Sequence, residues 1–230
     1  GLSMAKAILE INYWCAEEAT YRTTDDRTAS AECVYRSAYG RCGEESTFAV
    51  SVFRSVGIPA RQVYVPLWSH CDDNHAWVEV WSDGTWKFLG ACEPEEVLNK
   101  GWFTNASSRA MMVHSRWLLP VRPKEELVGR TGMALVANQL KTYAKTTNVE
   151  VTVLNADGTP ASGAEIRFEV LNYAEFGEIA CARTDAKGKK VLETGFGTLQ
   201  VTAYKDGAYA EQLVDVAKQH SCILRLGKDT

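Results

Sequence analysis

The stretch that decides the fold of the N-terminal half is Gly40-Arg41-Cys42-Gly43-Glu44-Glu45-Ser46. It joins a turn to a segment in which apolar residues recur at spacings of three and four, at Phe48, Ala49, Val52, Phe53 and Val56. That spacing predicts a buried helix, and Gly57 and Pro59 predict its end. Cys42 is therefore expected near the start of a core helix.

Two more helices are expected before this one. Residues from about 4 to 21 have a mostly helical apolar spacing, and Ser3 can cap their first turn. A shorter helix is expected from Ala31 to Tyr39. Both predicted helices precede the turn at Gly40.

Strand-like runs follow the buried helix. They cover Arg61 to Leu67, Ala76 to Trp81 and Thr85 to Leu89, with Ser82-Asp83-Gly84 as a hairpin turn. Helices followed by antiparallel strands indicate an α+β domain.

The pattern of apolar and polar residues changes from about Thr147. Val149 to Val153 alternates strictly, and further strand-like runs are separated by Asp157-Gly158, Ser162-Gly163, Lys187-Gly188 and Asp206-Gly207. Short strands at this spacing predict a small antiparallel β-sandwich. With Pro120 and Pro123 marking a boundary region, we expect two domains, residues 1–125 and residues 126–230.

Composition excludes several classes of function. The 230 residues are 46% hydrophobic and 23% charged, which is typical of a globular protein. The net charge is −4 without a Lys/Arg run, so nucleic acid is not expected as a partner. No apolar stretch has the length of a membrane span. The chain starts Gly1-Leu2-Ser3 rather than with Met, which is typical of a trimmed N-terminus.

The surroundings of Cys42 are suited to nucleophilic chemistry. A thiol at a helix N-terminus feels the positive end of the helix dipole, which favours the thiolate. Gly40 and Gly43 leave room for a substrate backbone, and a backbone N–H at the helix start can stabilise an oxyanion. Cys15, Cys33, Cys181 and Cys222 are read as ordinary cysteines, whereas Cys71 and Cys92 are expected near the site.

His75 is the expected base. It stands directly before the strand-like run Ala76-Trp77-Val78-Glu79-Val80, and a strand end holds an imidazole rigidly. A third residue that orients the imidazole is expected near Leu89 to Glu93. His114 and His220 are read as ordinary core or surface residues. A zinc cluster of His70, Cys71, His75 and Cys92 matches no standard spacing, so no metal or cofactor is expected.

Four blocks in this order resemble the transglutaminase-like core. They are Gly40-Arg41-Cys42-Gly43-Glu44, Val56-Gly57-Ile58-Pro59-Ala60-Arg61, His75-Ala76-Trp77-Val78-Glu79-Val80, and Trp86 with Leu89. The first block is especially similar to peptide:N-glycanases, and the resemblance covers roughly residues 5 to 95. It implies a papain-like α+β fold, a Cys-His-Asp triad in that chain order, and Cys42 and His75 as its first two members.

The third member departs from the family pattern. The family places Asp four residues after the Trp that corresponds to Trp86, and here that residue is Gly90. Glu93 can substitute for it, and we favour a Cys42–His75 dyad assisted by Glu93. Asp73 or Asn74 are alternatives, and so is a weakened or inactive site.

The resemblance implies a cysteine hydrolase or acyltransferase that acts on amide or peptide bonds through an acyl-enzyme thioester, with hydrolysis favoured. The expected substrate is a peptide or protein, including glycopeptide or cell-wall peptide. The alternative is an inactive binding module with a degenerate triad. Residues 101–110 are read either as a substrate wall or as a covering loop.

The C-terminal region resembles the prealbumin-like, Ig-like or carboxypeptidase-regulatory-like sandwiches of bacterial extracellular enzymes. The residues that carry this likeness are 157–164 and Thr184-Asp185-Ala186-Lys187-Gly188. It implies an accessory role and favours an exported protein, in the periplasm or at the cell surface.

Overall fold

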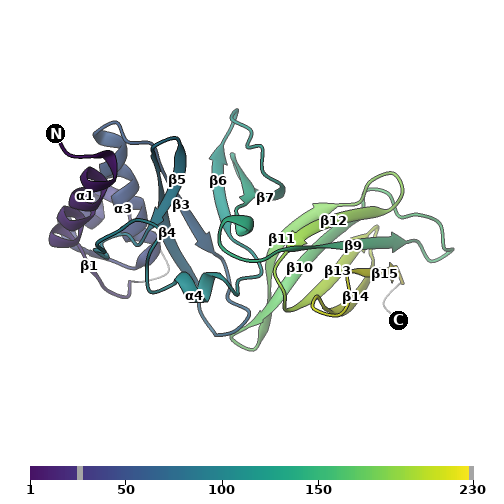
Figure 1. Cartoon of the computed structure of the whole chain (residues 1–230). Coiled ribbons are helices and arrows are strands. Elements are labelled where there is room, and N and C mark those ends of the chain that lie inside the picture. The colour runs from purple at the N-terminus through teal and green to yellow at the C-terminus, as the bar shows by residue number, and fades with distance from the viewer. Residues whose placement is uncertain (25–27, 228–230) are drawn as a thin grey trace. The chain divides into compact units, whose positions relative to one another are not determined.

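A computed structural model describes residues 1–24 and 28–227 (Figure 1). The chain forms two compact units. The first contains Gly1–Tyr64 and His75–Asn105, and the second contains Val65–Asn74 and Ala106–Thr230. The division into domains at residues 125 and 126 stays a prediction, and these compact units divide the chain at other points.

The helices of the first unit begin where the sequence predicts. They are α1 (Met4–Glu18), α2 (Ala31–Ser37) and α3 (Cys42–Ser55). Ser3 caps α1, because its Oγ accepts a hydrogen bond from the N–H of Lys6 at 3.3 Å. The first two helices end earlier than expected. The residues that follow them form β1 (Thr20–Tyr21) and β2 (Tyr39–Gly40), which pair with each other in parallel.

Three strands complete the core of the first unit, with β4 (His75–Ser82) between β5 (Thr85–Leu89) and β3 (Ala60–Val65). The expected hairpin is present, since Asp83 and Gly84 have φ values of 53° and 80° and join antiparallel strands. The helices lie on one face of these strands (Figure 1). Their shared apolar core includes Ile8, Phe48, Phe53, Val78, Val80 and Leu89.

The second unit contains three strands that the sequence did not reveal, β6 (His114–Leu118), β7 (Leu127–Thr131) and β8 (Ala134–Asn138). They are antiparallel, with β8 in the middle. A short 3-10 turn (Leu140–Thr142) follows them, and a short helix, α4 (Thr104–Ser107), precedes them.

The remaining strands form two sheets, ordered β11-β10-β13-β14 and β12-β9-β15. Their bounds are β9 (Thr147–Leu154), β10 (Glu165–Asn172), β11 (Glu175–Arg183), β12 (Lys189–Thr194), β13 (Thr198–Lys205), β14 (Ala208–Asp215) and β15 (Ser221–Arg225). The predicted glycine turns are present, and Gly158, Gly163, Gly188 and Gly207 have φ values of 73° to 87°.

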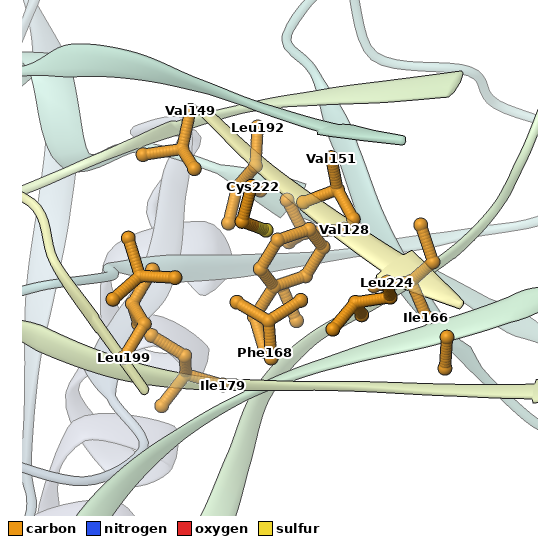
Figure 2. Close-up of a cluster of buried hydrophobic side chains, with 14 of the residues drawn as sticks. Val128, Val149, Val151, Ile166, Phe168, Ile179, Leu192, Leu199, Cys222 and Leu224 are labelled. Atoms are coloured by element: carbon orange, nitrogen blue, oxygen red, sulfur yellow. The ribbon is translucent and has the colours of Figure 1, made fainter. Parts of the chain in front are cut away.

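One apolar core joins the two sheets. It contains Val149, Val151 and Leu224 from one sheet and Ile166, Phe168 and Val201 from the other, and Figure 2 shows the ring of Phe168 in the middle of the cluster. This confirms the α+β class with a β-sandwich. One pair departs from the antiparallel pattern, because β15 pairs with β9 in parallel. The strands from β10 to β14 lie between β9 and β15 in the chain and supply the long crossover that a parallel pair needs.

The buried ring of Phe168 gives a test of this core. We expect Phe168→Ala to lower the free energy of unfolding by about 3–5 kcal/mol, because the side chain is fully buried and leaves a cavity. Phe176→Ala on the neighbouring strand is the matched control, because Phe176 is 40% exposed and its loss should cost less than about 1 kcal/mol. Urea denaturation measures both. Equal costs would contradict the assignment of Phe168 to the core.

Candidate active site

Cys42 is the first residue of α3 and is half-buried. Arg41 is the N-cap in extended conformation, so the thiol lies where the helix dipole is most positive. The expectation that Cys42 starts a core helix is met by this placement.

A buried carboxylate fixes the start of this helix. Glu44 is 1% exposed and accepts hydrogen bonds from the N–H of Ala29 (2.8 Å), the N–H of Arg41 (2.9 Å) and the hydroxyl of Thr24 (2.9 Å). Burial opposes the charge on Glu44, but these hydrogen bonds outweigh it and hold its pKa below the usual value. The carboxylate therefore locks the backbone directly before Cys42.

The first turn of α3 is also tied to the sheet. Gln62 on β3 donates from Nε2 to the carbonyl oxygen of Gly43 (2.8 Å) and to the hydroxyl of Ser46 (2.7 Å). That hydroxyl donates in turn to the carbonyl oxygen of Cys42 at 2.7 Å. These contacts hold the first turn of α3, which carries Cys42, against β3.

His75 is the first residue of β4 and is 5% exposed. Its ring centroid lies 4.5 Å from that of Trp102, 5.0 Å from that of Phe103 and 5.8 Å from that of Trp77. Burial lowers the pKa of the imidazole to about 4, so the ring is neutral near pH 7. Its Nε2 has no hydrogen-bond partner among the residues that the structure describes. A neutral imidazole with a bare nitrogen is suited to accept a proton.

Glu93 occupies the space that a side chain at position 90 would fill. A Cβ built on Gly90 would overlap with Oε2 of Glu93 and would lie 3.1 Å from its Cδ. The side chain of Glu93 therefore lies beside Gly90, and its Oε2 lies where the Cβ of a residue at position 90 would be. No hydrogen bond joins it to His75 within the described part of the chain.

Trp102 connects Glu93 with His75. Its indole N–H donates to Oε1 of Glu93 at 3.1 Å, while its ring contacts the imidazole. The indole is 63% exposed, whereas the adjacent Phe103 is fully buried. Phe103 thus packs in the core, as a covering loop requires, and Trp102 lies beside His75; the reading of residues 101–110 as a substrate wall stays a prediction.

The turn that carries Glu93 is held by Asn12 on α1. The buried amide of Asn12 donates to the carbonyl oxygens of Gly90 (2.9 Å) and Glu93 (3.3 Å), and its oxygen accepts from the N–H of Cys92 (3.0 Å). Cys92 has a φ of 57°, a conformation that costs energy for a residue with a side chain. Asn12 thus positions Glu93 by compensating for the strained backbone beside it.

Glu45 lies near Glu93 on the helix that begins with Cys42. It lies three residues after Cys42 and therefore on the same face of α3. The carboxyl is 3% exposed, and burial together with the negative charge of Glu93 raises its pKa to about 8. Burial also raises the pKa of Glu93. Both carboxyl groups are therefore harder to ionise than an exposed glutamate.

Residues 2–91 match the family model of the transglutaminase-like superfamily. They form a transglutaminase-like domain.

Several solved structures are also similar to this chain, with low sequence identity and low TM-scores. A TGase is 18% identical (TM-score 0.33), with 40% of this chain and 27% of that chain covered. Red sea bream transglutaminase is 11% identical (TM-score 0.37), with 98% of this chain and 53% of that chain covered. A 3-chlorocatechol 1,2-dioxygenase from Rhodococcus opacus is 14% identical (TM-score 0.31), with 50% of this chain and 71% of that chain covered. This chain thus spans about a quarter to a half of the two transglutaminases. No curated protein matches it.

Asp73 and Asn74, the alternatives for the third residue, stay predictions; Oδ1 of Asp73 accepts from the N–H of Asn74 at 2.7 Å. His114 is buried and pairs with the carbonyl oxygen of Ile179 at 2.7 Å. No group of three His, Cys, Asp or Glu side chains in residues 1–24 and 28–227 is arranged to hold a metal ion. None of the helices among these residues is long and apolar enough to cross a membrane.

Sequence reasoning missed Asn12 and Glu45 in the transglutaminase-like domain. Asn12 lies on the buried stripe of α1 between Ile8 and Cys15, so a polar residue at an apolar position of a predicted helix was the available signal. Glu45 had no such signal, because charged residues are ordinary in the first turn of a helix.

The buried carboxyl of Glu45 gives a pH-dependent test. Between its ordinary pKa of 4.5 and its pKa of about 8 in the folded protein, the folded state holds a proton that the unfolded chain has released. The wild type therefore loses stability from this group as the pH rises through that window. We expect the free energy of unfolding of Glu45→Gln, relative to the wild type, to increase with pH across it.

Urea denaturation at about pH 5 and about pH 8 measures this difference. Glu17→Gln is the matched control, because Glu17 is an exposed glutamate on α1. A difference between Glu45→Gln and the wild type that does not change with pH would rule out a buried, protonated Glu45.

Proposed function

We propose that the transglutaminase-like domain is a cysteine hydrolase or acyltransferase that acts on amide or peptide bonds, with Cys42 as nucleophile and His75 as base. The observation that carries the proposal is the imidazole of His75, which is buried, neutral and unpartnered at Nε2 among the described residues. It belongs to the same compact unit as a thiol at a helix N-terminus. The family match of residues 2–91 supports the same chemistry.

The reaction begins when Sγ of Cys42 forms a bond to the carbonyl carbon and its proton passes to Nε2 of His75. The carbonyl oxygen becomes an oxyanion, which N–H groups of the first turn of α3 stabilise. The intermediate collapses as the C–N bond breaks, and the leaving amine takes the proton from His75. Water or an amine then attacks the thioester carbonyl and gives a proton to His75. The C–S bond breaks, the acid or the new amide leaves, and the proton on His75 returns to Sγ of Cys42.

Glu93 supports the imidazolium that forms in this reaction. This role is supported by the side chain of Glu93, which lies beside Gly90, and by Trp102, which donates to Glu93 and contacts the imidazole. Burial raises the pKa values of Glu93 and Glu45. This arrangement favours an active site over the alternative of an inactive binding module. Hydrolysis, the peptide or glycopeptide substrates and an exported location stay predictions.

Alkylation of Cys42 tests whether Cys42 and His75 act as nucleophile and base. Cys33 is an internal control thiol, because it also lies in the first turn of a helix and is exposed. We expect iodoacetamide to label Cys42 faster than Cys33, and His75→Ala to remove the difference. The difference should be lost as the pH falls through about 4, because His75 then becomes protonated.

Mass spectrometry of the labelled peptides separates the seven cysteines. Burial raises the pKa of Cys15 to about 12 and of Cys222 to about 11, so these thiols contribute little background. Equal labelling of Cys42 and Cys33, unchanged by His75→Ala, would refute the catalytic proposal and favour a binding module.

Moving the carboxylate tests the role of Glu93. We expect Glu93→Ala to slow the labelling of Cys42 at least about tenfold, because the imidazolium loses its counter-charge. The double variant Gly90→Asp/Glu93→Ala returns a carboxylate from the position used by the family, and we expect it to restore most of the rate. Gly90→Asp alone should be destabilised, because its side chain overlaps with Glu93. If the double variant is as slow as Glu93→Ala although it is folded, a carboxylate at this place is not what His75 requires.

A further inference from the structure

The outer face of the four-stranded sheet carries a cleft of about 600 Å³, a volume in the range of ligand sites. Residues of β11, β10, β13 and β14, which lie side by side in that order, line this cleft together with the turns at Gly163 and at Asp206-Gly207 (Figure 1). Every lining residue belongs to the second unit. The cleft is therefore formed without any part of the unit that contains Cys42 and His75.

A row of side chains crosses all four strands at this cleft. Cross-strand pairing places Glu165 between Arg183 and Tyr204. Tyr204 in turn lies opposite Tyr209 on β14. Ile166, the residue after Glu165, is fully buried in the core between the sheets. Since successive side chains of a strand point to opposite faces, the row lies on the outer face of the sheet.

The two tyrosines of this row form a small aromatic platform. Their ring centroids are 6.3 Å apart, and their ring planes differ by only 24°. Tyr204 is 41% exposed and Tyr209 is 37% exposed, so both contribute to the surface of the cleft. A tyrosine combines an apolar ring face with a hydroxyl group. Two such rings at a similar orientation suit the C–H face of a sugar ring.

An ion-pair cluster lies beside the platform. Oε1 of Glu165 accepts hydrogen bonds from Nε (3.0 Å) and Nη2 (2.9 Å) of Arg167. The guanidinium carbon of Arg167 lies 5.2 Å from the ring centroid of Tyr204. Oε2 of Glu165 lies 3.4 Å from Nη2 of Arg183. Glu165 thus holds two guanidinium groups at the cleft.

The two arginines differ in what they have left for a ligand. Arg167 faces two carboxylates, because Oε2 of Glu178 lies 3.6 Å from its Nε. Arg183 shares only Glu165 and donates from Nη1 to the carbonyl oxygen of Gly163 at 3.0 Å. Its side chain is 68% exposed, and a guanidinium has five N–H donors. Arg183 therefore presents donors in the fork arrangement that binds a carboxylate.

We propose that this cleft binds an acidic oligosaccharide, with a sugar ring on Tyr204 and Tyr209 and a carboxylate of the sugar on Arg183. The second unit then has a binding function of its own rather than serving only as a spacer. The proposal does not depend on the roles of Cys42 and His75.

The place of the cleft on the sheet favours a saccharide over a peptide. An extended peptide binds an exposed strand edge through backbone hydrogen bonds. This cleft crosses β10 and β13, and each of these strands is already paired on both sides. A ligand that lies across them meets side chains and no unpaired strand edge. Rings and guanidinium groups are then the recognition elements, which suits a sugar with a carboxylate.

Calorimetric titration of the full chain tests the proposal. The probes are tetramers of galacturonate, glucuronate and mannuronate, each also as its methyl ester. We expect at least one free acid to bind, and its methyl ester to bind roughly tenfold to a hundredfold more weakly, because the charged partner of Arg183 is lost. Raising sodium chloride from about 0.05 M to about 0.5 M should also weaken binding of the acid. Backbone amide shifts in NMR should change mainly at residues 163–167, 183 and 204–209.

Two variants separate the parts of the cleft. Arg183→Gln should lower the affinity for the free acid roughly tenfold to a hundredfold and leave that for the methyl ester unchanged. Tyr204→Ala should weaken the binding of both forms, because the platform serves the sugar ring. Arg130→Gln and Tyr173→Ala are the matched controls, because both side chains are exposed in the second unit and neither lines the cleft. Thermal unfolding verifies that each variant is folded.

The proposal is overturned if none of the three tetramers binds, or if a methyl ester binds as tightly as its free acid. It is also overturned if Arg130→Gln weakens binding as much as Arg183→Gln, because general charge attraction would then be sufficient. N-acetylated tetraalanine tests a carboxylate on a peptide. If it binds more tightly than the tetramers and loses this affinity in Arg183→Gln, the cleft is a peptide site instead.

Discussion

The geometry of the first unit depends on one buried carboxylate. Glu44 accepts hydrogen bonds from the backbone of Ala29, the backbone of Arg41 and the hydroxyl of Thr24. A buried charge is tolerated only where its oxygens are satisfied, so this network ties Thr24 and Ala29 to the start of α3. Because Cys42 directly follows Arg41, the network also determines where the candidate nucleophile lies. The apolar packing of α3 on the strands then fixes the helix, and Cys42 with it, relative to the sheet of this unit.

A neutral side chain fixes another part of the candidate site. Asn12 holds the turn that carries Glu93. Its amide satisfies several backbone groups that lack partners in regular secondary structure. A loop that is both irregular and buried needs such a donor or acceptor, since water does not reach its backbone. The candidate site thus depends on a side chain that takes no part in the proposed chemistry.

The electrostatics of the site follow from burial. The aromatic rings around His75 exclude water, which keeps the imidazole neutral. Burial also raises the pKa values of Glu45 and Glu93. The candidate site therefore holds a neutral imidazole and two carboxyl groups whose pKa values are all perturbed by burial. Perturbed pKa values of this kind are common at functional sites.

The sequence by itself determined the local features. Ser3 as a cap, Cys42 at the start of a periodic apolar helix, the turn at Asp83 and Gly84, and the alternating strands of the sandwich were readable because each depends on residues within a few positions of one another. The order of Cys42, His75 and Glu93 along the chain was readable too. Only the tertiary structure decided that Glu93 fills the space at Gly90, that Asn12 and Glu45 lie beside it, and that β15 pairs in parallel with β9. These relations join residues that are dozens of positions apart, and they exist only where separate elements pack together and must satisfy each other's buried polar groups.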